Sequence, residues 1–167
     1  MTNIARLQYS KYMLGNNDRL KAAGISVDEH KRRVLQELRD AGASGYGLMH
    51  MESHYLPQII HPNEHIGGVI YGHFEEGFAM LVATDLRVIF LDRKPFFTNQ
   101  EEITYDVVSG INFGHAGFSS SVTLHTRIKD YHIRTLNLRC ADQFVEYIEY
   151  RCLEHGAQER PNVLPLT

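Results

Sequence analysis

The most informative local pattern in the chain is residues 83–91, Ala-Thr-Asp-Leu-Arg-Val-Ile-Phe-Leu. Thr84 and Asp85 can hydrogen-bond their own backbone in a tight turn. The residues after this turn alternate, so Val88 and Phe90 are expected to point into a core and Arg87 out of it. The stretch therefore predicts a hairpin between two strands and a structural role for its residues.

The alternating pattern extends from this hairpin in both directions. From residue 64 to residue 138, apolar residues recur with the two-residue period of half-buried strands, between short turn sequences. Residues 92–101 are interpreted as a loop. The predicted strands cover residues 64–74, 78–83, 86–91, 103–108, 111–114, 119–126 and 131–138. Seven strands with such short connections predict an antiparallel meander.

A helix is predicted after the strands, over residues 141–155. Its apolar positions lie at helical spacing and are Ala141, Phe144, Val145, Ile148 and Cys152. A single amphipathic helix in this position is expected to close the open end of a strongly bent sheet. Residues 157–167 are predicted to form a flexible tail.

The chain before the strands is predicted to be helical. Residues 26–29, Ser-Val-Asp-Glu, have the sequence of a capping box and should begin a helix that ends before Gly42. A shorter helix is predicted over residues 47–55, after which Pro57 and Pro62 interrupt the chain. An earlier segment has three residues on one helical face, Ile4, Leu7 and Lys11.

These patterns divide the chain into three parts. Residues 1–57 are predicted to be a helical region, residues 58–156 a sheet domain and residues 157–167 the tail. The predicted class is therefore α+β, with a seven-stranded bent antiparallel sheet or barrel that a C-terminal helix caps.

Composition indicates an ordinary globular protein. The chain has 167 residues, of which 43% are hydrophobic and 22% charged. No apolar run approaches the roughly 20 residues that span a bilayer, and no secretory signal is expected from the first residues. Two cysteines, Cys140 and Cys152, are too few for a disulfide framework. A cytoplasmic protein with reduced thiols is expected.

Charge is unevenly distributed along the chain. The net charge is -3, which argues against general nucleic-acid binding. Residues 1–45 have a net charge of +3 and residues 46–167 a net charge of -6. The basic residues of the first part are interpreted as solvated helix faces.

Four stretches resemble the bacterial pleckstrin-homology-like (PH-like, YokE-like) domain family. They are Pro62-Asn63-Glu64-His65-Ile66, Gly77-Phe78, residues 83–91 and residues 103–111, Ile-Thr-Tyr-Asp-Val-Val-Ser-Gly-Ile. The resemblance covers about residues 58–153 and implies a PH-like sheet with a C-terminal helix. It also implies a binding or assembly module, because the family shares no enzymatic activity.

Two binding modes follow from this resemblance. A PH-like sheet can take up an extended peptide at an edge strand next to the C-terminal helix, as PTB domains do, or pair there with a second copy. Phosphoinositide binding, known in eukaryotic pleckstrin domains, is not expected, since Glu75 and Glu76 in the first hairpin would repel phosphate.

A second candidate surface lies in the predicted loop of residues 92–101. Arg93 and Lys94 stand next to Phe96 and Phe97, which combines cations with apolar side chains that could enter a membrane or contact a partner. Alternatively, the two phenylalanines pack under the N-terminal helices.

A metal site has weak support in the sequence. His50 and His54 are four residues apart and would share a helix face. Glu52 lies off that face, so the pair lacks the His-Glu-x-x-His order of zinc proteases. The ten histidines are interpreted mainly as surface and half-buried imidazoles, and neither a metal nor another cofactor is expected.

Catalytic signals are otherwise lacking in the sequence. Ser119, Ser120 and Ser121 do not form a Gly-x-Ser-x-Gly elbow, and both cysteines are interpreted as packed thiols. Basic residues in the late hairpin could form a rim but are interpreted first as surface charge; they are Arg127, Lys129, Arg134 and Arg139.

Three functional hypotheses remain open. The leading one is a non-catalytic cytoplasmic module that recognises another protein or associates with itself. The second is peripheral binding to an anionic membrane, and the third is a small metalloenzyme that uses His50 and His54.

Overall fold

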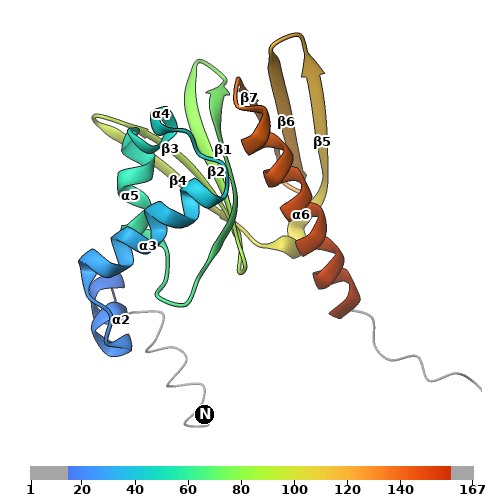
Figure 1. Ribbon diagram of the computed structural model, residues 1–167. Helices are drawn as coiled ribbons and strands as arrows, with labels where there is room; N and C mark the ends of the chain where they lie inside the picture. The colour runs from blue at the N-terminus through green and yellow to red at the C-terminus, as the bar shows by residue number, and fades with distance from the viewer. Residues whose placement is uncertain (1–14, 159–167) are drawn as a thin grey trace, which may run out of the picture.

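The computed structural model describes residues 15–158 (Figure 1). Its elements in chain order are α2 (Asn16–Ala23), α3 (Val27–Asp40), α4 (Gly45–Leu48), α5 (Met51–Ile59), β1 (Ile66–Phe74), β2 (Gly77–Thr84), β3 (Val88–Lys94), β4 (Phe97–Ile103), the 3-10 helix η1 (Tyr105–Val107), β5 (Val108–Ala116), β6 (Ser119–Thr126), β7 (Asp130–Thr135) and α6 (Leu138–Gln158). The expected helix face of Ile4, Leu7 and Lys11, and most of the expected tail, lie outside the described residues.

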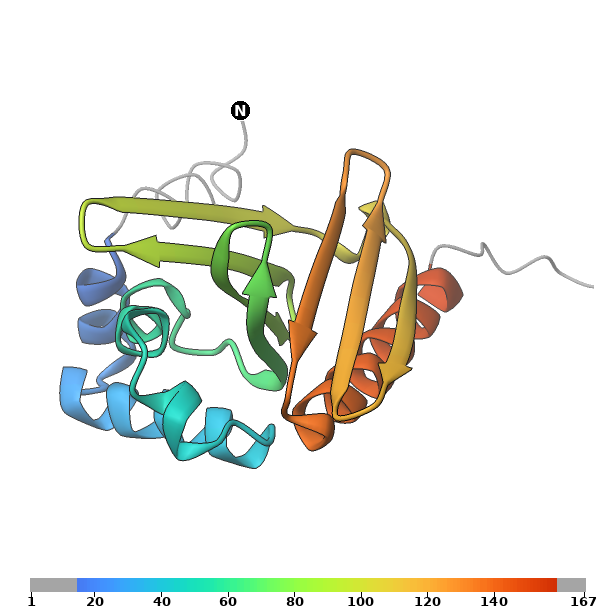
Figure 2. The same ribbon diagram turned by 90° about the horizontal axis from the view of Figure 1, so that it is seen from above.

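The strands form one antiparallel sheet with the order β4-β3-β2-β1-β7-β6-β5. Figure 2 shows that the sheet is strongly bent, because the β3–β4 hairpin runs across the direction of β6 and β7. At one corner Glu101 of β4 accepts hydrogen bonds from Lys129 Nζ and the Tyr131 hydroxyl, at 2.6 and 2.7 Å. The predicted α+β class, with a bent seven-stranded sheet and a C-terminal helix, is confirmed.

One predicted strand was misplaced. Residues 92–101 are not a loop but form the end of β3, a tight turn and most of β4, while residues 104–107 lie outside the sheet. β4 pairs along its length with β3, from Lys94↔Phe97 to Val88↔Ile103. Its side chains are mostly polar and only Ile103 is buried. This edge strand is held by backbone hydrogen bonds to β3 and not by buried side chains. A search for alternating hydrophobic residues therefore does not detect it.

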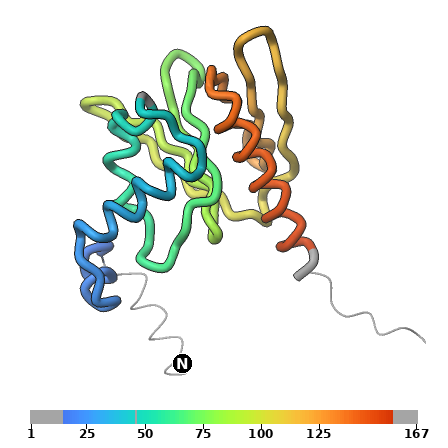
Figure 3. Tube along the Cα trace, viewed as in Figure 1, coloured from blue at the N-terminus to red at the C-terminus, as the bar shows by residue number. Residues whose placement is uncertain are grey.

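Both faces of the central strands are covered. Toward α6, Leu81 and Phe90 join a core with Phe144 and Ile148. Toward the N-terminal helices, alternate residues of the same strands join a second core, which contains Val34, Leu38, Leu56, Met80, Val82, Ile89 and Leu91. Figure 3 shows the N-terminal helices beside the β1–β4 half of the sheet and α6 beside the β5–β7 half. This two-sided burial explains the continuous apolar runs in β2 and β3.

The helix boundaries follow local capping, with two differences from expectation. Ser26 accepts a hydrogen bond from the Glu29 amide at 3.1 Å, as the capping box predicts. The helix predicted over residues 47–55 is instead two helices, α4 and α5, and Pro57 lies inside α5. α6 begins at Leu138, earlier than predicted, since the Asn137 side chain accepts from the Cys140 amide at 3.1 Å.

The turn in residues 83–91 has the predicted backbone but not the predicted Arg87. Thr84 Oγ1 accepts from the amides of Leu86 and Arg87 and closes the turn. Arg87 does not point to solvent: it is 8% exposed, and its Nε and Nη2 donate to Glu64 at 2.9 and 3.0 Å. The prediction of an outward Arg87 was wrong because Glu64, 23 residues earlier, supplies a buried partner.

Candidate binding site

The four residues of the predicted apolar and basic loop lie at the β3–β4 hairpin. Phe96 is fully exposed and Phe97 is 56% exposed, so these rings do not pack under the N-terminal helices. The cations already have partners. The Arg93 guanidinium lies 4.5 Å from the centre of the Tyr55 ring, and Lys94 Nζ lies 3.5 Å from an Asp92 oxygen. The hairpin tip is therefore apolar, and of its two cations only Lys94 lies beside a carboxylate of the described residues.

The two histidines of the predicted metal pair have different surroundings. His50 precedes α5, and its Nδ1 lies 2.9 Å from the Tyr71 hydroxyl, with the two rings stacked. His54 is exposed in the next turn. Glu52 is buried and accepts from the Arg93 amide at 3.1 Å. Within residues 15–158, no group of three His, Cys, Asp or Glu side chains could hold a metal ion.

Both cysteines are packed thiols, as the sequence predicts. Cys140 is buried, and its Sγ donates to the Val69 carbonyl at 2.7 Å. Burial raises the pKa of the Cys140 thiol to about 11, and burial also raises the pKa of Cys152. A neutral, buried thiol is a poor nucleophile, so this geometry gives Cys140 a packing role.

The outer edge of β5 is an open sheet edge. β5 is the last strand of the sheet and pairs on one side with β6, from Val108↔Thr126 to Ala116↔Ser119. Its nine residues, Val-Ser-Gly-Ile-Asn-Phe-Gly-His-Ala, include no Lys, Arg, Asp, Glu or Pro. Charges and prolines are the usual means by which exposed edges avoid pairing with other chains. The edge of β5 lacks both.

The opposite edge strand, β4, differs in this respect. Glu101 bonds to Lys129 and Tyr131 across the corner of the sheet, and Glu102 forms an ion pair with Arg87 at 2.5 Å. The negative charges on β4 disfavour pairing there. The two edges of the sheet are thus chemically distinct, and β5 is the one suited to accept a further strand.

The N-terminal helices do not cover the β5 edge. α3 and α5 pack on β1 and β3, and α6 lies between them and β5 (Figure 1). On one side of α6, Gln143 lies close to Gly42 after α3, and Tyr147 lies close to Gly67 of β1. Helical geometry therefore places Val145 and Glu149 on the side toward β5. The described residues therefore leave this edge accessible.

A pocket of about 940 Å³ lies where β1 meets β7 and the start of α6. We call it the seam pocket. Three arginines line it, Arg39 of α3, Arg134 of β7 and Arg139 of α6. The sequence interpretation treated Arg134 and Arg139 as surface charge and did not single out Arg39. Only the tertiary fold brings residue 39 beside residues 134–140, so no local signal identifies this group.

One family model matches the part of the chain that forms the sheet and most of α6. A family model described as a bacterial PH domain matches residues 60–150. A solved structure of a DUF1696 family protein with a pleckstrin-homology domain, from Shewanella loihica PV-4, matches with a TM-score of 0.39 and 15% identity, over 62% of this chain and 88% of that chain. No curated protein matches. Because the family model covers more than half of the chain, the protein belongs to the bacterial PH domain family.

Proposed function

We propose that this protein is a recognition module that binds an extended segment of another protein as an added strand along β5. Membership of the bacterial PH domain family supports a non-catalytic binding module as the general class. The observation that carries the finer proposal is the open, uncharged edge of β5. The free thiols are consistent with the cytoplasmic location expected from the sequence.

Strand addition needs a long edge with outward backbone groups, and β5 provides them along nine residues, since only the groups on its inner side pair with β6. A partner strand would gain affinity from main-chain hydrogen bonds and specificity from the side chains that flank them. Exposed apolar rings stand at this end of the sheet: Phe113 is 43% and Phe118 is 95% exposed. These rings provide apolar surface for alternate residues of an added strand.

Charge on α6 favours a foreign segment over a second copy. Asp142 and Glu149 are exposed on the helix side nearest β5, and neither forms an ion pair with another described residue. Pairing β5 with β5 of a second copy would bring two such acidic sides together, which is unfavourable. A basic or neutral extended segment avoids this repulsion.

The test is selection of binding peptides from a random library against the full chain. We expect selected peptides to be extended and basic, and to protect amides of residues 108–116 from hydrogen exchange. Phe113→Lys should weaken their binding about tenfold, because it adds a charge of the partner's sign beside the edge. Thr98→Lys, on the exposed β4 edge, is the matched control and should have little effect.

Two results would contradict this proposal. Protection that falls outside residues 108–116 would place recognition on another surface. A stable dimer of the native chain in analytical ultracentrifugation, with β5 amides protected in the absence of peptide, would assign the edge to self-association.

Membrane binding through the β3–β4 hairpin is a second candidate, favoured by the full exposure of Phe96. Within the described residues, no helix has the length and apolar character to cross a bilayer.

Insertion of the hairpin into a membrane predicts that the chain pellets with anionic vesicles and that the double variant Phe96→Ser with Phe97→Ser abolishes pelleting. Salt should have only a modest effect, since Asp92 offsets the charge of Lys94 and Arg93 supplies the one net positive charge of the hairpin. Phe118→Ser, at another exposed tip, is the control. Absence of pelleting by the native chain would exclude this function.

A further inference from the structure

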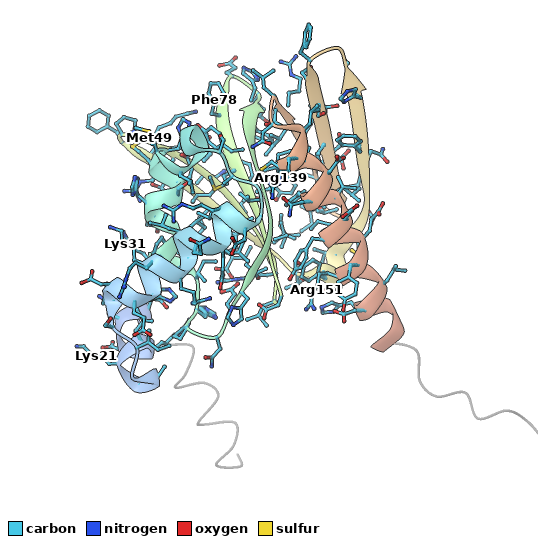
Figure 4. All side chains as sticks on the ribbon, viewed as in Figure 1. Lys21, Lys31, Met49, Phe78, Arg139 and Arg151 are labelled. Carbon is cyan, nitrogen blue, oxygen red and sulfur yellow. The ribbon has the colours of Figure 1, made fainter. Side chains whose placement is uncertain are left out.

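We propose that the seam pocket binds a small organic anion that has an apolar, ring-containing part. The pocket is a separate site from the β5 edge, and the two proposals are independent. Its volume of about 940 Å³ falls within the usual range for small-molecule sites, roughly 300–1,000 Å³. Figure 4 shows two of its residues, Phe78 on the β1–β2 hairpin and Arg139 near the start of α6.

Positive charge is concentrated at this pocket on an otherwise acidic protein. Arg39, Arg134 and Arg139 line it, and no Asp or Glu is among its lining residues. None of the three arginines forms an ion pair or a side-chain hydrogen bond with another described residue. Guanidinium groups match phosphate and carboxylate oxygens through paired hydrogen bonds. Three unpaired arginines around one cavity therefore favour an anionic ligand.

The floor and one wall of the pocket are apolar. Met80 and Val69 are buried beneath it, and Phe78 is 49% exposed at its side. Tyr71 and Phe78 stack at 5.8 Å between ring centres, and the His73 ring meets Phe78 edge-on at 5.7 Å. This aromatic surface suits a flat apolar group, which inorganic phosphate or a sugar phosphate does not offer.

The walls of the pocket are held together by hydrogen bonds that do not involve the arginines. The Asn137 side chain donates to the Gly42 carbonyl at 3.0 Å, and Gln143 donates to the Asp40 carbonyl at 3.2 Å. These bonds connect the end of α3 to the start of α6. His73 of β1 stands opposite Arg134 of β7 in the sheet. The arginines therefore project from fixed backbone, which lowers the entropic cost of binding.

The experiment uses isothermal titration calorimetry of the full chain with 1-naphthyl phosphate as the probe. We expect saturable one-to-one binding, with inorganic phosphate and 1-naphthol each at least tenfold weaker. Arg134→Gln and Arg139→Gln should each weaken binding of the probe about tenfold, since each removes a charged hydrogen-bond donor. Arg127→Gln, an exposed arginine outside the pocket, should leave the affinity unchanged.

Other outcomes overturn the proposal. If inorganic phosphate bound as tightly as 1-naphthyl phosphate, the pocket would be a simple anion site. If 1-naphthol bound as tightly as 1-naphthyl phosphate, the pocket would be a simple apolar site. If Arg127→Gln lost as much affinity for the probe as Arg134→Gln and Arg139→Gln, the attraction would be non-specific. If the titration gave no heat and the chemical shifts of His73 did not change, the probe would not bind. The urea unfolding midpoints of the variants should match that of the native chain, because Arg127, Arg134 and Arg139 are all exposed.

Discussion

Glu64→Ala is expected to lower the free energy of unfolding by about 3–5 kcal/mol, the range for breaking a buried ion pair. Glu64 is fully buried and accepts from Arg87 Nε and Nη2, from Thr84 Oγ1 and from the His61 amide, all within 3.0 Å. Removing the carboxylate leaves the buried Arg87 with only the exposed Glu102 as a carboxylate partner among the described residues. The variant also removes part of the connection between the segment before β1 and the β2–β3 turn, and the hydrogen bonds between His65 and Asp85 retain the rest.

The measurement is urea unfolding at neutral pH. Glu76→Ala, in the exposed β1–β2 turn, is the control and should change stability by less than about 0.5 kcal/mol. The double variant Glu64→Ala with Arg87→Met should be more stable than the sum of the two single changes predicts, because it leaves no buried charge. A loss below 1 kcal/mol in Glu64→Ala would refute the role assigned to this pair.

The same pair predicts how stability depends on pH. Burial alone would raise the pKa of Glu64, but hydrogen bonds from Arg87 and from the His61 amide lower it below its ordinary value. A carboxyl group with a lowered pKa contributes its full stability above its unfolded pKa, about 4.3. That contribution is lost as the pH falls through the lowered folded pKa. The stability difference between the native chain and Glu64→Ala should therefore shrink in acid.

Gly72→Ala is expected to open the seam between the two halves of the sheet, at a cost of about 3 kcal/mol, the upper end for overpacking. A Cβ at Gly72 would lie 2.0 Å from the Arg134 carbonyl oxygen and 2.9 Å from an Ile133 methyl. The first of these atoms is backbone and cannot rotate away. β1 and β7 are the neighbours that join the β1–β4 half to the β5–β7 half, so the strands must separate locally.

Hydrogen exchange and urea unfolding measure this effect. Amides of β7 should exchange faster in Gly72→Ala, while those of the β2–β3 pair change less. Gly110→Ala is the matched control, because a Cβ at Gly110 meets no atom within 4 Å. Unchanged protection of β7 in Gly72→Ala would show that the seam tolerates a methyl group. The variant should also weaken binding of 1-naphthyl phosphate, since Gly72 and Arg134 both line the seam pocket.

The local sequence was sufficient for most of the secondary structure. Thr84 closes its turn, Ser26 caps α3, and the stripe from Ala141 to Cys152 faces the core, because each of these features depends on residues near one another in the sequence. The β4 strand was missed since its pairing with β3 leaves a mostly polar surface. Phe96 and Phe97 were identified as candidates from the residue types of the hairpin. The sequence did not determine whether their rings are exposed or packed under the N-terminal helices.

The fold class could be predicted from the sequence, because the two-residue and helical periods of hydrophobic residues are local properties of the chain. The pairings between distant residues depend on the tertiary structure. It buried Arg87 against Glu64, left β5 as the open edge, and gathered Arg39, Arg134 and Arg139 around one pocket. The physical reason is that burial and electrostatic partners depend on positions in space. Residues as far apart as Arg39 and Arg139 become neighbours only when α3 and α6 pack at the seam.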